Sequence, residues 1–343
     1  MIRDYLSVVE VAVYLGITPD EVYDLMKEGV IPFYKSTSGQ YRFKLEDIKP
    51  LRNIKSSSSD NNTIQIKRGD TISIHVNNTI QTMIVKSSTR MEEIKDNVVN
   101  LVITSPPYFN AKLYGEEEDS EDLGNIHDLY EWFEKIRKVY KEIFRVLQPG
   151  RKFFLNIMNL PVRDKNGFRS LNIVGKTIDI CEEIGFIFKR EIIWQKTNSV
   201  KSSFGSYPYP GGILLNFSHE FILEFEKPAP KGYKKYAHVT KEQKEKSKLD
   251  KEFWIEIKKS DIWIMSPAPS GRNRKHPAPF PEELPYRIIK AYSYVGETVL
   301  DPFAGIGTTL LVASQLERNG IGYEINPSYV ETFLHNINSN KIK

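Results

Sequence analysis

Two short segments of the chain carry side chains whose types and spacing could do chemistry. The first, TSPPY at residues 104–108, directly follows the apolar run 98–103, which predicts a buried strand. Each proline fixes φ at about −65° and thereby the direction of the neighbouring carbonyl groups. A hydroxyl, a fixed carbonyl and an aromatic ring could together grip a flat ring that bears an amino group. The alternative is a turn that only ends the strand, because proline cannot continue a central ladder.

The second segment, residues 296–325, predicts a strand, a glycine-rich turn, a helix and a further strand. Gly305 and Gly307 would let the backbone approach a ligand closely. Glu324 stands at the predicted end of the next strand, where a carboxylate can accept hydrogen bonds from ribose hydroxyls. The third glycine of a dinucleotide-binding turn is missing and no lysine follows, so a nucleoside without phosphates fits better than a phosphate-binding loop.

Composition places these segments in an ordinary globular chain of 343 residues with a net charge of +4. This length suggests about two domains, and the mild positive charge is compatible with a nucleic-acid partner. No apolar run is long enough to span a membrane, and no signal-peptide pattern opens the chain, so we expect a cytoplasmic protein without a membrane partner. The single cysteine, Cys181, excludes an internal disulfide and a cysteine-based zinc site. It is expected to be a core thiol, and no metal is expected.

The N-terminal residues form a small separate pattern. Ser7 and Thr18 each open a capping box, and Gly16 separates the two helices that these boxes predict. A hairpin with a basic, aromatic arm that includes Arg42 follows. The segment LSVVEVAVYLGITPDEVYDLMKEGVIP resembles the winged helix-turn-helix of excisionase and MerR-type proteins. The resemblance implies a DNA-binding domain over residues 1–52 with Arg42 as a DNA contact; a docking module for protein partners is the alternative.

A serine-rich linker at residues 53–62 leads into a larger domain, residues 63–343. From residue 98 onward, predicted strands alternate with predicted helices, which is typical of an α/β sheet with mostly parallel strands. The lysine-rich segment 228–251 interrupts this alternation. It could be a solvated insertion or one that faces DNA. The predicted strands are 98–104, 153–157, 186–194, 219–227, 298–300 and 321–324, and the predicted helices are 126–147, 172–184 and 307–316.

Taken together, these motifs resemble the amino-group DNA methyltransferases that use S-adenosylmethionine. The resemblance rests on TSPPY at 104–108, DPFAGIGTT at 301–309, GYE at 322–324 and HPAPFPEELP at 276–285. The catalytic motif precedes the cofactor motif, as in the permuted β group of that family. The resemblance spans residues 80–335. It implies an S-adenosylmethionine-dependent, Rossmann-like α/β fold with permuted motif order.

The resemblance also implies roles for individual residues. Ser105 Oγ and the carbonyl of Pro106 would accept the two hydrogens of the target amino group, Pro107 would keep that ledge rigid, and Tyr108 would stack on a base flipped out of the duplex. In this family, serine at the first position of the tetrapeptide SPPY, residues 105–108, favours cytosine N4 over adenine N6 as the target. The implied cofactor-binding residues are Asp301, Phe303, Gly305, Gly307, Thr308 and Glu324, with His276, Pro277 and Phe280 closing over the methionine end.

One departure from the family pattern concerns the cofactor site. Ser87 and Ser88 stand where family members often carry a glycine–aspartate pair that contacts the cofactor. A C5-cytosine mechanism is excluded, since it needs a cysteine beside proline and Cys181 precedes two glutamates.

The expected contacts with double-stranded DNA lie in two loops, both of which could instead simply be exposed. We expect a target-recognition insertion at about residues 196–260, and no motif encodes the recognition site or an oligomeric state. The expected contacts are Lys196, Lys201 and Tyr207 in the first loop, and Arg272, Arg274 and Lys275 in the second.

The motifs and the resemblance therefore predict a site-specific cytosine-N4 DNA methyltransferase of a restriction–modification system, and the sequence leaves open whether a cognate restriction endonuclease exists. Three alternatives remain open at this point. They are an adenine-N6 DNA methyltransferase, a catalytically silent DNA-binding regulator, and an RNA or protein methyltransferase.

Overall fold

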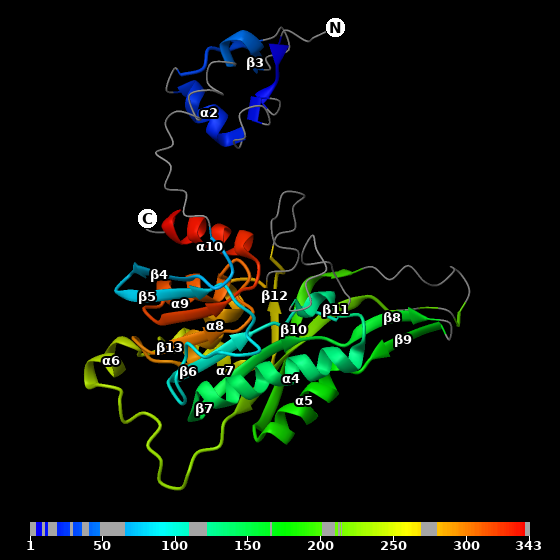
Figure 1. Cartoon of the computed structure of the whole chain (residues 1–343), viewed down its shortest axis with the longest axis vertical. Helices are drawn as coiled ribbons and strands as arrows, with labels where there is room; N and C mark the ends of the chain where they lie inside the picture. Colours follow the sequence, from blue (N-terminus) through cyan, green and yellow to red (C-terminus); the bar gives the residue numbers. More distant parts are fainter. Residues whose placement is uncertain are drawn as a thin grey trace. The chain divides into compact units, whose positions relative to one another are not determined.

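The protein divides into two compact units, Met1–Gln65 and Ile66–Lys343 (Figure 1). The structure is a computed structural model. It describes residues 5–8, 11–12, 19–27, 30–35, 41–48, 66–109, 122–164, 167–200, 210–211, 213, 215–268 and 280–339.

The N-terminal unit packs helix α2 (Pro19–Lys27) against a small antiparallel sheet. Its strands are β1 (Tyr5–Leu6), β2 (Tyr34–Lys35) and β3 (Tyr41–Lys44), in the order β1-β3-β2. The predicted hairpin is confirmed, since Tyr34 pairs with Arg42 across it. Arg42 is half-buried on β3. A small apolar core holds the unit together, formed by Val11, Ala12, Val22, Met26, Ile31, Phe43 and Ile48.

The larger unit is built on a nine-stranded sheet in the order β12-β10-β11-β7-β6-β13-β14-β5-β4. The five strands from β7 to β5 in this order run parallel to one another, which confirms the predicted α/β class. Strand β11 is antiparallel to both of its neighbours, and β4 forms an antiparallel edge. The strands are β4 (Thr71–Val76), β5 (Thr79–Ile84), β6 (Val99–Thr104), β7 (Leu147–Ile157), β10 (Ile187–Val200), β11 (Phe217–Glu226), β12 (Ile262–Met265), β13 (Thr298–Asp301) and β14 (Asn319–Tyr323). A separate hairpin consists of β8 (Leu160–Asp164) and β9 (Gly167–Leu171).

Helices cover both faces of this sheet, so its central strands are apolar on both sides. Along β7, Phe153 and Leu155 join the core on one face, and Phe154 joins the core on the other. Helices α4 (Leu129–Val146) and α5 (Ile173–Ile184) lie side by side on the first face (Figure 1). The buried Cys181 belongs to this core, as expected. The second face carries α7 (Lys251–Lys259), α8 (Glu283–Tyr292), α9 (Thr308–Gln315) and α10 (Pro327–Ser339). Among the described helices, none combines the length and the apolar character needed to cross a membrane.

Part of the expected target-recognition insertion at about residues 196–260 belongs to the sheet, and a role of this region in target recognition stays a prediction. Residues 196–200 still belong to β10, and β11 occupies a central place in the sheet between β10 and β7. The lysine-rich segment, with helix α6 (Lys241–Lys246), packs at the end of the sheet where β13 begins. There, Gln243 Nε2 donates to the carbonyl of Val295, 2.9 Å away. This segment therefore lies at the amino ends of the parallel strands, opposite the ends at which both sequence motifs begin.

A buried charge cluster joins the lysine-rich segment to the sheet. Glu297 accepts a hydrogen bond from Arg151, and the two side chains are 1% and 2% exposed. His238 Nε2, from the segment, lies 2.9 Å from the other carboxylate oxygen of Glu297. Arg151 Nε also donates to the carbonyl of Asn100, so the cluster connects β6, β7 and the start of β13.

Removing this carboxylate is expected to be costly. Glu297→Ala would leave the Arg151 guanidinium buried without its counter-charge, and we expect the free energy of unfolding to fall by about 3–5 kcal/mol. Urea denaturation followed by circular dichroism measures this quantity. The control is Glu92→Ala, because Glu92 pairs with Arg90 on the surface and its loss should change stability by no more than about 0.5 kcal/mol. Equal losses in the two variants would contradict the prediction.

Candidate functional site

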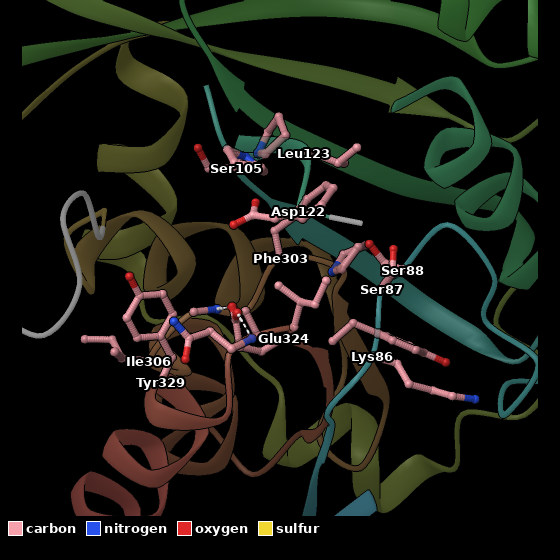
Figure 2. A pocket seen from close by; sticks show the side chains of 18 of the residues that line it. Lys86, Ser87, Ser88, Ser105, Asp122, Leu123, Phe303, Ile306, Glu324 and Tyr329 are labelled. Atoms are coloured by element: carbon pink, nitrogen blue, oxygen red, sulfur yellow. Dashed lines mark hydrogen bonds between the residues drawn. The ribbon is translucent and has the colours of Figure 1, made fainter. Parts of the chain in front are cut away.

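A pocket of about 930 Å³, measured with its solvent-open mouth, lies at the carboxyl ends of β6, β13, β14 and β5. Open α/β sheets bind ligands at this end of their strands. The pocket brings together the two segments singled out in the sequence, although nearly two hundred residues separate them (Figure 2). Of the predicted site residues, it is lined by Ser105, Pro106, Pro107, Tyr108, Phe280, Phe303, Gly305, Thr308 and Glu324.

The two segments are joined behind the pocket wall by Asp301. Thr104 Oγ1 at the end of β6 and Thr309 Oγ1 at the start of α9 each donate to its carboxylate, both at 2.6 Å. Burial raises the pKa of Asp301 to about 6, although these hydrogen bonds favour the ionised form. Asp301 is not among the residues that line the pocket. It therefore holds the carboxyl end of β6 against the start of α9.

The glycine turn needs its glycines for conformation and for space. Gly305 has φ of +53° and Gly307 has φ of +78°, a region that side chains with a Cβ rarely adopt. A Cβ at Gly307 would lie 2.2 Å from Cδ2 of Phe333. Gly305 lines the pocket, whereas Gly307 does not, so Gly307 shapes the turn from behind.

Glu324 follows β14 and is held by the backbone. Its Oε2 accepts a hydrogen bond from the Gly305 amide at 2.9 Å, and its Oε1 accepts one from the Asn326 amide at 2.8 Å. Burial raises the pKa of Glu324 to about 7, while these two amides pull it downward. The carboxylate is thus fixed in direction and has capacity left to accept hydrogen bonds from a ligand.

Tyr108, at the other side of the pocket, is anchored through its hydroxyl. The hydroxyl donates to Glu220 Oε2 at 2.6 Å, and Asn156 Nδ2 donates to the same oxygen at 2.7 Å. Lys196 Nζ lies 2.6 Å from the other oxygen of Glu220. Glu220 is 6% exposed, and the side chain of Lys196 is only 17% exposed. Lys196 is therefore not the free phosphate contact that its sequence context suggests, but the counter-ion of the group that orients Tyr108.

This anchor leads to a prediction for Tyr108. Under the role that the family resemblance implies for Tyr108, Tyr108→Phe and Glu220→Ala should each lower kcat/KM for the acceptor by about tenfold, because a hydrogen bond to a charged group contributes about 1.5–3 kcal/mol. Affinity for the cofactor that the resemblance implies should not change. The double variant should lose little more than Glu220→Ala alone, since that variant already lacks the hydrogen bond to Tyr108.

The matched control for these variants is Glu226→Ala, on the same strand. Glu226 pairs with Lys152 and not with Tyr108, so this kcat/KM should be unaffected. Fully additive losses in the double variant would show that the anchor does not act on Tyr108.

Sequence reasoning missed one acidic side chain in the pocket. Asp122 lines it, as the N-cap of the short helix η1 (Leu123–Asn125), and its Oδ1 accepts a hydrogen bond from the Gly124 amide at 2.8 Å. The residue ends the acidic run at 116–122, so no sequence signal separates it from its neighbours. Ser87 and Ser88 also line the pocket. Other lining residues that the sequence did not single out are Lys86, Leu123, Pro302, Ala304, Ile306, Tyr323, Ile325, Asn326 and Tyr329.

The remaining predicted site residues fall outside the described part of the chain: Lys201, Tyr207, Arg272, Arg274, Lys275, His276 and Pro277. Within that described part, no three His, Cys, Asp or Glu side chains gather into a group that could hold a metal ion.

Comparisons with known proteins agree with this geometry. Residues 99–335 match the N6/N4 DNA methylase family model, and residues 5–49 match a helix-turn-helix domain. A type II methyltransferase of Methanothermobacter thermautotrophicus, M.MthZI, is 33% identical over 74% of this chain and 75% of its own length. Another, M.MjaI of Methanocaldococcus jannaschii, is 34% identical over 70% of this chain and 85% of its own length.

A solved structure is similar over the same region. It is a DNA modification methylase, described as putative, from Thermus thermophilus in complex with S-adenosyl-L-methionine. It is 30% identical, covers 76% of this chain and 95% of its own, and superimposes with a TM-score of 0.59.

Proposed function

Because this chain belongs to the N6/N4 family of DNA methylases, we propose that it transfers a methyl group from S-adenosylmethionine to the N4 amino group of a cytosine in duplex DNA. The observation that carries the proposal is that Ser105 to Tyr108 and Glu324 line one pocket. The serine at the head of the motif favours cytosine N4 over adenine N6. In this proposal the chain has two domains, a helix-turn-helix domain at residues 1–52 and a methyltransferase domain at residues 63–343.

The residues of the pocket fit the methyl donor. Glu324, fixed by two amides, would accept hydrogen bonds from the ribose hydroxyls. Gly305 allows close approach of the backbone, and the rings of Phe303 and Phe280 provide apolar wall. When bound, S-adenosylmethionine supplies an electrophilic methyl group on a positively charged sulfur.

The catalytic side of the pocket would position the acceptor. Ser105 Oγ and the carbonyl of Pro106 would accept the two amino hydrogens, which aims the nitrogen lone pair across the pocket. Tyr108, anchored by Glu220, would stack on the base. The base would have to leave the duplex to reach this site. Catalysis would then rest on positioning and electrostatics, with no covalent intermediate on the protein.

The proposed setting is a restriction–modification system in the cytoplasm, where methylation would protect sites from a cognate endonuclease. The type II methyltransferase names of M.MthZI and M.MjaI support this setting. The helix-turn-helix domain, with Arg42 in its hairpin, would add a second contact with DNA.

Nucleoside mass spectrometry tests the proposal. Wild type and Ser105→Ala are expressed in a host without DNA methylation, and the digested DNA is analysed for methylated bases. N4-methylcytosine with the wild type alone is the expected result. N6-methyladenine would keep the enzyme class and overturn the choice of base.

A second candidate is a DNA-binding regulator that no longer transfers methyl groups. It is favoured by the serines at 87 and 88, where the family often has an acid, and by the helix-turn-helix domain. Soluble wild-type protein that binds duplex DNA and leaves no methylated base would support it.

A further inference from the structure

Asp122 is a charged side chain in the pocket to which the proposed chemistry gives no role. Its Oδ1 caps η1, and its Oδ2 has no hydrogen-bond partner among the residues that the structure describes. The side chain is partly exposed and lines the cavity. One carboxylate oxygen is therefore available to a ligand.

The position of Asp122 within the pocket is the second observation. In Figure 2 its carboxylate lies between Ser105 and Glu324, and all three residues line the same cavity. The charge of Asp122 also acts on Glu324, whose pKa it helps to raise. A carboxylate in this place faces the space between the ribose end of the pocket and the catalytic ledge.

The inference rests on the proposed function, which specifies the ligand groups on either side of this space. Glu324 would hold the ribose and Ser105 the acceptor amine. The sulfur of the methyl donor must then lie between them, because the donor's methyl group points from the sulfur to the amine. We infer that Asp122 is a charge-selecting residue, which binds the sulfonium form of the cofactor in preference to the neutral thioether left after transfer.

The physical reason is that the two forms differ by one positive charge close to one carboxylate. A unit charge facing another at a few ångströms in a partly enclosed pocket interacts appreciably, whereas a neutral thioether does not. Asp122 would thus favour entry of the methyl donor and departure of S-adenosylhomocysteine. Ser87 and Ser88 also line the pocket but carry no charge, so they cannot make this distinction.

The test is isothermal titration calorimetry of wild type, Asp122→Asn and Glu324→Gln with three ligands. These are S-adenosylmethionine, S-adenosylhomocysteine and sinefungin, in which an ammonium group replaces the methylated sulfonium centre. Asparagine keeps the cap of η1, because its Oδ1 can still accept from the Gly124 amide. The Asp122 variant is expected to bind the two cationic ligands about tenfold more weakly and to bind S-adenosylhomocysteine as the wild type does.

Glu324→Gln is the matched control. All three ligands contain the ribose, so losing the contact with it should weaken the binding of each ligand equally. Equal losses for all three ligands in Asp122→Asn, or no loss, would overturn the inference while leaving the proposed function intact. Wild-type protein that binds none of the ligands would overturn the proposed function itself, and this inference with it.

Discussion

Replacing Ser105 by alanine is expected to lower the rate of methyl transfer by about 10²–10³-fold, the range seen when one preorganised polar group is removed from an active site. Ser105 lies at the pocket, directly after Thr104, whose hydroxyl is fixed by Asp301. The substitution removes the acceptor that we propose for one amino hydrogen and leaves this scaffold in place. The loss should therefore appear in kcat, with unchanged affinity for S-adenosylmethionine.

Single-turnover transfer of a radiolabelled methyl group to duplex DNA measures this effect, and calorimetry measures cofactor affinity. Ser73→Ala is the control, because Ser73 is exposed on the edge strand β4 and the change there is chemically the same. A Ser105 variant that keeps more than about one tenth of the wild-type rate would argue against the role given to its hydroxyl.

The second large effect concerns pH. Affinity for S-adenosylmethionine should rise about tenfold per pH unit from pH 5 to about 7 and then level off. The pKa of Glu324 is raised to about 7 in the free protein, mainly by burial. Below that pH the carboxyl group is protonated, whereas two ribose hydroxyls donate best to the ionised form. Binding in acid must therefore release a proton, and that requirement weakens it.

This pH dependence distinguishes a Glu324 that titrates on binding from a Glu324 that only lines the pocket. Glu324→Gln cannot titrate, so its affinity should be low and flat over the same range. Calorimetry in buffers of different ionisation enthalpy would also detect the released proton in the wild type. An affinity that is equally flat in both proteins would exclude Glu324 as the titrating contact.

The sequence predicted the parts of the site that depend on local pattern. The sequence predicts both TSPPY after a buried strand and Gly305 before Glu324, because a strand end and a tight turn are short-range features. The strands can be predicted from apolar runs such as that of β6, because the central strands of a parallel sheet are buried on both faces.

Long-range pairing accounts for what the sequence did not predict. Asp301 looked like a cofactor contact, but its partner Thr104 stands 197 residues away and the pair lies behind the wall. Lys196 looked like an exposed loop residue, yet β10 continues past it and the adjacent strand supplies Glu220. Asp122 stands in a run of acidic residues, and its sequence context does not show that it lines the pocket.

The order of strands in the sheet has a consequence for protein synthesis. Strands β13 and β14 lie between β6 and β5, yet they are synthesised after both of these strands. Until then the β4–β5 hairpin has no sheet to join, and β6 and β5 each present an open edge of the kind that promotes aggregation. A nascent chain that stops before Thr298 therefore lacks the two strands that join β6 to β5, and it lacks the turn that contains Gly305 and Gly307.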